Sequence, residues 1–70
     1  NDELAEDHKP NTLQHETIDA AAMSVDEAVM QMELSENKSV LFFTNMDTDA
    51  LNALYRRSDG TLNWVEPEAA

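Results

Sequence analysis

The chain has 70 residues, of which 15 are acidic and 4 are basic, and its net charge at pH 7 is −11. So few cations exclude a basic patch that binds nucleic-acid phosphates, and the absence of cysteine excludes disulfides and thiolate metal sites. No apolar run approaches the ~20 residues of a membrane span, and the first residues lack a signal-peptide pattern. We therefore expect a cytoplasmic chain that contacts neither nucleic acid nor membrane directly.

The first segment, residues 1–14, is polar and acidic, and its only large apolar side chains are Leu4 and Leu13. Such a composition buries too little apolar surface to offset the entropy lost on ordering. We predict a disordered linker over residues 1–14, a folded domain over residues 15–67 and a short tail over residues 68–70.

The next two elements are a short strand and a helix. His15–Ala20 includes two adjacent β-branched residues and is a candidate first strand. Met23–Leu34 is predicted to be helical because Ser24 can cap its start, and Glu27 three residues later completes a capping box. One helix face has the i, i+3, i+4, i+7 spacing of a buried stripe. Its residues are Val25, Ala28, Val29 and Met32.

The rest of the chain is predicted to form strands. Ser39–Asn45 contains four consecutive large apolar residues, which favours a strand buried on both faces. Leu51–Arg57 is the next strand, and Leu62–Val65 follows the hairpin signal Asp59-Gly60. The fold class is therefore α+β, with one helix on a mostly antiparallel sheet.

The hairpin turn leaves two registers open. A two-residue turn would place Tyr55 opposite Trp64, whereas a three-residue loop with Gly60 in the left-handed conformation would shift the pairing by one residue. In either register both faces of the hairpin carry apolar side chains, and one helix covers only one face. The remainder forms an exposed apolar patch, which marks an interaction surface on a small protein.

No pattern in the sequence predicts an enzyme, a cofactor or a metal site. His8 and His15 have no second ligand at helical or hairpin spacing. The segment Asp47-Thr48-Asp49 lacks the glycine and the final glutamate of a calcium loop, and a polar turn explains it better. The aromatic residues could form a base-stacking platform, but without surrounding Lys and Arg a core or a protein interface explains them better.

The small size of the domain argues for a partner chain. A domain of roughly fifty residues buries only about 60% of its unfolded surface, and such domains add disulfides, a metal or a second chain. Since the sequence offers neither disulfides nor a metal site, we expect oligomerisation to supply the missing stability. We expect a homodimer interface made of Phe42, Phe43, Leu51, Leu54, Tyr55 and Trp64.

Several short motifs occur in order from Met23 onward. They are Met23-Ser24-Val25-Asp26-Glu27-Ala28, Gln31-Met32-Glu33-Leu34, Phe42-Phe43-x-x-Asn45, Tyr55-Arg56-Arg57-x-Asp59-Gly60 and Glu66-Pro67. With these motifs the chain resembles the C-terminal domain of the long-form bacterial ribosome hibernation promoting factor, a family also called sigma modulation protein. The resemblance implies a strand-helix-three-strand domain that forms a homodimer. It also implies that an N-terminal domain of the full-length protein binds the small ribosomal subunit, so that paired C-terminal domains join two inactive ribosomes.

Two other functions stay open from the residues alone. The first is a small-ligand sensor that uses the cleft between two subunits, which would need convergent polar groups in an apolar pocket. The second is an acidic module that acts on a basic transcription or translation factor, and its binding would weaken sharply with added salt.

Overall fold

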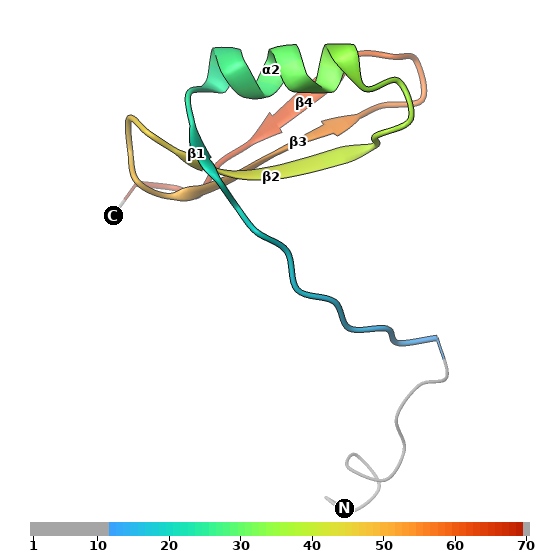
Figure 1. The fold of residues 1–70 in the computed structure, drawn as a ribbon, viewed down its shortest axis with the longest axis horizontal. Coiled ribbons are helices and arrows are strands. Elements are labelled where there is room, and N and C mark those ends of the chain that lie inside the picture. The colour runs from blue at the N-terminus through green and yellow to red at the C-terminus, as the bar shows by residue number, and fades with distance from the viewer. Residues whose placement is uncertain (1–11, 70) are drawn as a thin grey trace, which may run out of the picture.

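The computed structural model describes residues 12–69. Its elements are β1 (Ala22–Met23), α2 (Val25–Leu34), β2 (Val40–Asn45), β3 (Leu51–Arg56) and β4 (Leu62–Val65). The four strands form one sheet in the order β1-β2-β3-β4, and α2 lies on one face of it (Figure 1). β1 pairs with β2 in parallel, and the other two pairings are antiparallel. The predicted α+β fold is confirmed, whereas most of the linker predicted over residues 1–14 lies outside the described residues.

The start of α2 follows the predicted capping box. Ser24 is the N-cap, and its hydroxyl accepts a hydrogen bond of 3.1 Å from the Glu27 backbone N–H. Asp26 and Glu27 add negative charge to the positive end of the helix dipole. The predicted inward stripe is also confirmed, because Ala28 and Met32 are fully buried while the two valines pack against the core.

The C-terminal end of α2 is completed by a residue of β3. The last helical turn has no basic side chain, although its free carbonyls carry partial negative charge. The Arg56 guanidinium reaches these carbonyls from the sheet, and its Nη2 donates to the Met32 oxygen at 2.7 Å and to the Ser35 oxygen at 3.2 Å. A third acceptor is the Lys38 carbonyl oxygen at 3.4 Å. Arg56 therefore fastens the helix end to the sheet.

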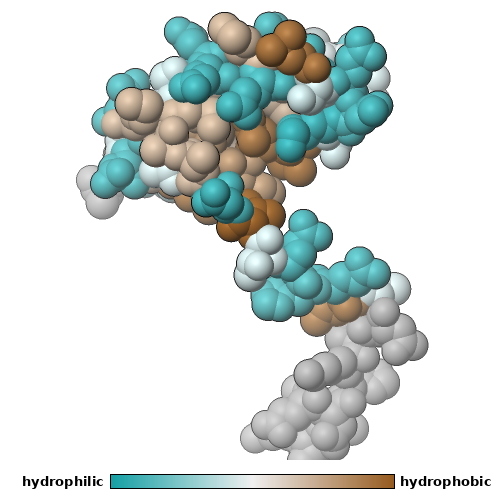
Figure 2. Space-filling view, viewed as in Figure 1, coloured by the Kyte–Doolittle hydropathy of each residue, from teal (hydrophilic) through white to brown (hydrophobic). Residues whose placement is uncertain are grey.

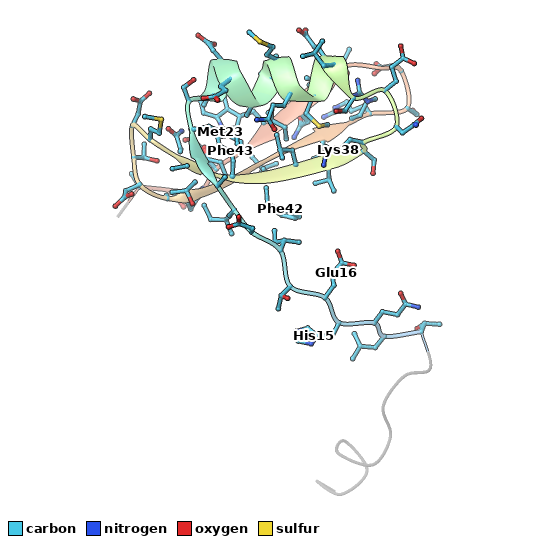
Figure 3. The ribbon with its side chains drawn as sticks, in the orientation of Figure 1. His15, Glu16, Met23, Lys38, Phe42 and Phe43 are labelled. Atoms are coloured by element: carbon cyan, nitrogen blue, oxygen red, sulfur yellow. The ribbon has the colours of Figure 1, made fainter. Side chains whose placement is uncertain are left out.

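The core lies between α2 and the sheet. Its buried apolar residues are Met23, Ala28, Met32, Phe43 and Leu54. Figure 3 shows Met23 and Phe43 on the helix side of the sheet and Phe42 pointing away from it. Successive side chains of a strand point to opposite faces, so β2 buries Phe43 completely and leaves Phe42 38% exposed. The expectation that this strand is buried on both faces is wrong for a single copy of the chain.

The first strand is shorter than expected and begins later. The expected strand over His15–Ala20 is not formed, and β1 consists of Ala22–Met23. The Ala21 carbonyl accepts from the Thr44 N–H at 2.9 Å, and the pairing does not continue to earlier residues. Because Ile18 is the one large apolar residue between His15 and Ala21, pairing this polar segment with β2 would bury little apolar surface.

The hairpin between β3 and β4 has the three-residue loop. Arg57 N–H donates to the Thr61 carbonyl at 2.8 Å, and Gly60 N–H donates to the Arg57 carbonyl at 2.9 Å. Gly60 has a φ of 93°, a conformation that favours glycine. Trp64 consequently lies opposite Leu54 and not opposite Tyr55. Of the two registers left open by the sequence, the shifted one is confirmed.

Candidate interaction surface

The sheet face opposite α2 carries a continuous set of mostly apolar side chains. We call it the open face, and strand register assigns to it Val40, Phe42, Thr44, Leu51, Ala53, Tyr55, Asn63 and Val65. Its five large apolar residues are between 38% and 56% exposed. In Figure 2, hydrophobic colours extend from the left and middle of the domain down to its underside, where the chain from the N-terminus enters, while the upper side is mostly hydrophilic. Within residues 12–69, no helix covers this face.

The central strand distributes its side chains in an unusual way. Asn52, Leu54 and Arg56 of β3 point toward α2, whereas Leu51, Ala53 and Tyr55 point to the open face. The covered face of β3 is therefore the more polar one, and its uncovered face carries no charged side chain. A sheet face that stays in water normally has the opposite composition.

A hollow lies on the open face over Ala53, the small residue between Phe42 on β2 and Val65 on β4. It measures about 250 Å³ and is bounded at one end by Leu51 and Pro67. Apolar side chains form most of its lining. Of its two polar lining residues, Asn52 bonds to groups on the other side of the sheet, and Glu66 is exposed to solvent. The hollow thus lacks the convergent polar groups that a small-molecule site uses for orientation.

The predicted interface residues of β2 and β3 do not lie on one surface. Phe42, Leu51 and Tyr55 are on the open face. Phe43 and Leu54 are 0% and 1% exposed beneath α2. The structure therefore brings three of these side chains together at an accessible surface and assigns the other two to the core.

Trp64, the remaining predicted interface residue, lies on the helix side of β4. Its indole Nε1 donates to Asn52 Oδ1 at 2.9 Å, and Asn45 Nδ2 donates to the same oxygen at 2.9 Å. Both asparagines are almost completely buried, and Asn45 Oδ1 accepts from the Asp47 N–H at 2.9 Å. These bonds connect the end of the core to the β2–β3 turn, so the Trp64 position is set by an internal polar cluster.

Sequence reasoning missed three apolar residues of the open face, Val40, Ala53 and Val65. The signal that identifies them is the register, because a three-residue loop ending at Gly60 places Val65 opposite Ala53. The same loop contains an acidic side chain held by hydrogen bonds, since the N–H and the hydroxyl of Thr61 both donate to Asp59 Oδ1. These hydrogen bonds hold the pKa of Asp59 below its usual range because they stabilise the ionised carboxylate.

Other kinds of site are not found in the part of the chain that the structure describes. It contains no group of three or more His, Cys, Asp or Glu side chains that could hold a metal ion. Its helix is too short and too polar to span a membrane. The open face is therefore the strongest candidate for a functional surface.

Comparison with known families supports the resemblance. The family described as "Sigma 54 modulation/S30EA ribosomal protein C terminus" matches residues 7–62, which is most of the chain. The chain belongs to this family. The S30EA C-terminal match covers β1, α2, β2 and β3 completely. It confirms the resemblance inferred from the sequence motifs and agrees with the expectation of a non-enzymatic chain.

Individual relatives of this chain also have names that refer to ribosome hibernation. A ribosome hibernation promotion factor of Rhizobium meliloti (strain 1021) is 34% identical over 65 residues, which cover 93% of this chain and 34% of the relative. Proteins of the same name from Bradyrhizobium diazoefficiens and Bacillus subtilis (strain 168) are 35% and 29% identical and cover 86% and 94% of this chain. This member of the S30EA C-terminal family spans about a third of the length of these relatives.

Proposed function

We propose that this chain is the homodimerisation module of a cytoplasmic ribosome hibernation promoting factor. In the proposal, two full-length copies pair through this module and join two ribosomes into a translationally inactive dimer. Contact with the small ribosomal subunit belongs to a part of the full-length protein outside this chain. The names of the relatives support the role in hibernation, and the net charge of −11 supports the absence of direct nucleic-acid binding by this fragment.

The observation that carries the proposal is the composition of the two sheet faces. Polar Asn52 and Arg56 are on the covered face of β3, whereas Leu51 and Tyr55 are exposed on the open face. Scattered exposed apolar residues need no partner, but a contiguous set does. A two-fold dimer would cover the same surface on both copies and would enlarge a core that is small for an independent domain.

The first test is the molar mass of the fragment across a dilution series. The wild type should have the mass of two chains when concentrated and of one chain when dilute. The double variant Phe42→Asp/Tyr55→Asp should stay at the mass of one chain and keep its circular dichroism spectrum, because both side chains lie outside the core. Met30→Asp is the matched control, since Met30 is 58% exposed on the outside of α2. This control should pair like the wild type.

Two results would contradict the dimer. One is a wild type with the mass of a single chain at every concentration. The other is a double variant that pairs as tightly as the wild type while the fold of both is intact.

The second test uses the full-length protein and ribosomes in a sucrose gradient. The same double variant should sediment with single ribosomes and should not produce paired ribosomes, because only the C-terminal surface is changed. Persistence of paired ribosomes with charged residues at both positions would exclude the open face as the joining surface.

Salt dependence separates this proposal from an acidic module that binds a basic factor. Added salt weakens attraction between opposite charges, so binding to a basic partner would be lost. Two copies with a charge of −11 each repel one another, and their apolar contact is insensitive to screening. Dimerisation should therefore persist as salt rises, whereas binding to a basic partner should be lost.

A further inference from the structure

The N-terminal segment of the described chain leaves the sheet on the side of the open face. We call residues 12–21 the arm. Its root is fixed by Thr44, whose N–H and hydroxyl donate to the carbonyls of Ala21 and Ala20 at 2.9 and 2.8 Å. From there the arm extends away from α2 and from the sheet (Figure 1). Between residues 12 and 19 it forms no hydrogen bond with the rest of the described chain.

The arm and β2 enclose a notch beside the open face. The notch measures about 250 Å³, and its apolar part is formed by Ile18 of the arm with Val40 and Phe42 of β2. Ile18 and Phe42 nevertheless remain 52% and 38% exposed. The arm therefore does not cover the open face of its own copy, and both walls of the notch present unfilled apolar surface. In Figure 3 the arm carries His15 and Glu16 on the side of the sheet to which Phe42 points.

We propose that the arms are exchanged in the dimer: each arm lies along the open face of the second copy, with Ile18 packed against the partner's Phe42. This inference rests on the proposed function, because the arm can contact a second copy only if that copy binds to the open face. Without the exchange the projecting Ile18 would stay exposed beside the interface that it borders.

The length of the arm is sufficient for this contact. Ten extended residues span about 33 Å at ~3.3 Å each, whereas four strands at a spacing of ~4.8 Å form a sheet roughly 15 Å wide. An arm that starts at the β1 edge can therefore cross the whole open face of a partner. In its own copy the arm borders only the β2 side of the open face before it extends away from the domain.

The arm and the border of the open face carry opposite charges. The arm contains Glu16 and Asp19, which line the notch together with Lys38 of the same copy. The cations beside the open face are Lys38, which lines the notch, and Arg57, whose Nη2 donates to Asn63 Oδ1 at 3.0 Å on that face. The exchanged arm would bring its carboxylates to the partner's Lys38 and Arg57, which lie at the end of the sheet opposite the Thr44 end where the arm begins.

The test compares two substitutions within the arm of the complete chain. Ile18→Asp should raise the dimer dissociation constant at least tenfold. Leu13→Asp is the matched control, because Leu13 is 67% exposed and lies at an odd-numbered position, facing away from the Ile18 side of an extended chain. It should change the constant less than twofold. Equal affinity of the Ile18→Asp variant and the wild type would overturn the exchange.

Direct contact is tested by nuclear Overhauser effects in a mixed dimer of isotope-labelled and unlabelled copies. Intermolecular effects from the Ile18 methyl groups to aromatic ring protons support the exchange. Intermolecular effects at Phe42 without any at Ile18 would overturn the exchange and leave the dimer standing. Absence of intermolecular effects at both residues, with the mass of a single chain, would overturn the dimer as well.

Discussion

The two faces of this sheet are built from the same strands and differ in what covers them. Phe43 and Phe42 are neighbours on β2, yet the first is fully buried beneath α2 and the second is more than one third exposed. On β3 the covered side even holds the polar residues, because Asn52 pairs with Asn45 and Arg56 binds the helix end. On the covered face, polar side chains occur where they form specific hydrogen bonds. The open face has the apolar composition of a protein core, although no element of the described chain covers it.

The largest expected effect separates the two phenylalanines. Phe43→Ala should lower the free energy of unfolding by about 3–5 kcal/mol, because it leaves a cavity in the core. Phe42→Ala should lower it by roughly 1 kcal/mol in dilute solution, where pairing does not contribute, since its side chain is partly in water already. Urea unfolding followed by circular dichroism measures both values. Equal losses for the two variants would break the distinction between the faces.

The next effect concerns polar residues on the two faces. Asn52→Ala should cost about 1–3 kcal/mol, because the buried Asn45 amide and the partly buried Trp64 indole both lose their acceptor. Asn63→Ala on the open face is the control and should change stability by less than about 0.5 kcal/mol. Trp64 fluorescence should shift to longer wavelength only in the first variant. A silent Asn52→Ala would mean that the covered face does not depend on this cluster.

A smaller loss of stability is expected from a substitution at the start of α2, the helix that covers one face of the sheet. Ser24→Ala removes the hydroxyl that accepts from the Glu27 N–H and should cost about 1 kcal/mol. Ser58→Ala, in the exposed hairpin loop, is the matched control and should leave the melting temperature unchanged. If both variants melt together with the wild type, the helix start does not depend on this cap.

The smallest effect is the pH dependence contributed by Asp59 in the hairpin that joins β3 to β4. Its pKa is lower in the folded chain than in the unfolded chain, so the unfolded chain binds the proton more tightly. Its contribution to stability is present above the ordinary aspartate pKa and is lost as the pH falls through the lower folded value. Asp59→Ala should therefore make the acid-side loss of stability less steep. An identical slope in thermal melts between pH 5 and 2, a window of about one unit above and below the relevant pKa values, would refute this.

Elements with strong local signals could be predicted from the sequence. Ser24 and Glu27 define a helix start through chemistry within one turn, and the strand Leu62–Val65 is bounded by Gly60 and Pro67. The His15–Ala20 strand was wrong because strand formation depends on a neighbour to pair with, and two β-branched residues do not supply one.

The candidate surface was less predictable for a physical reason. Val40, Leu41, Phe42 and Phe43 are all apolar, so their run has no period that tells which side meets the helix. The Asp-Gly signal is compatible with two loop lengths, and a slip of one residue moves Trp64 from one face to the other. Tertiary contacts decide which side of β2 meets the helix and which register the hairpin adopts. Among them, the polar cluster of Asn45, Asn52 and Trp64 and the Arg56 hydrogen bonds hold the covered side of β3.

The Arg56 bonds have a consequence for how the domain opens and closes. They connect a helix end to a strand residue 24 positions away. A helix of ten residues is shorter than the ~12–15 needed for stability alone in water, so α2 persists only while β3 is in place. The helix and the β2–β3 hairpin should consequently unfold as one cooperative unit, and amide protons in the last turn of α2 should exchange with deuterium only when the whole domain opens.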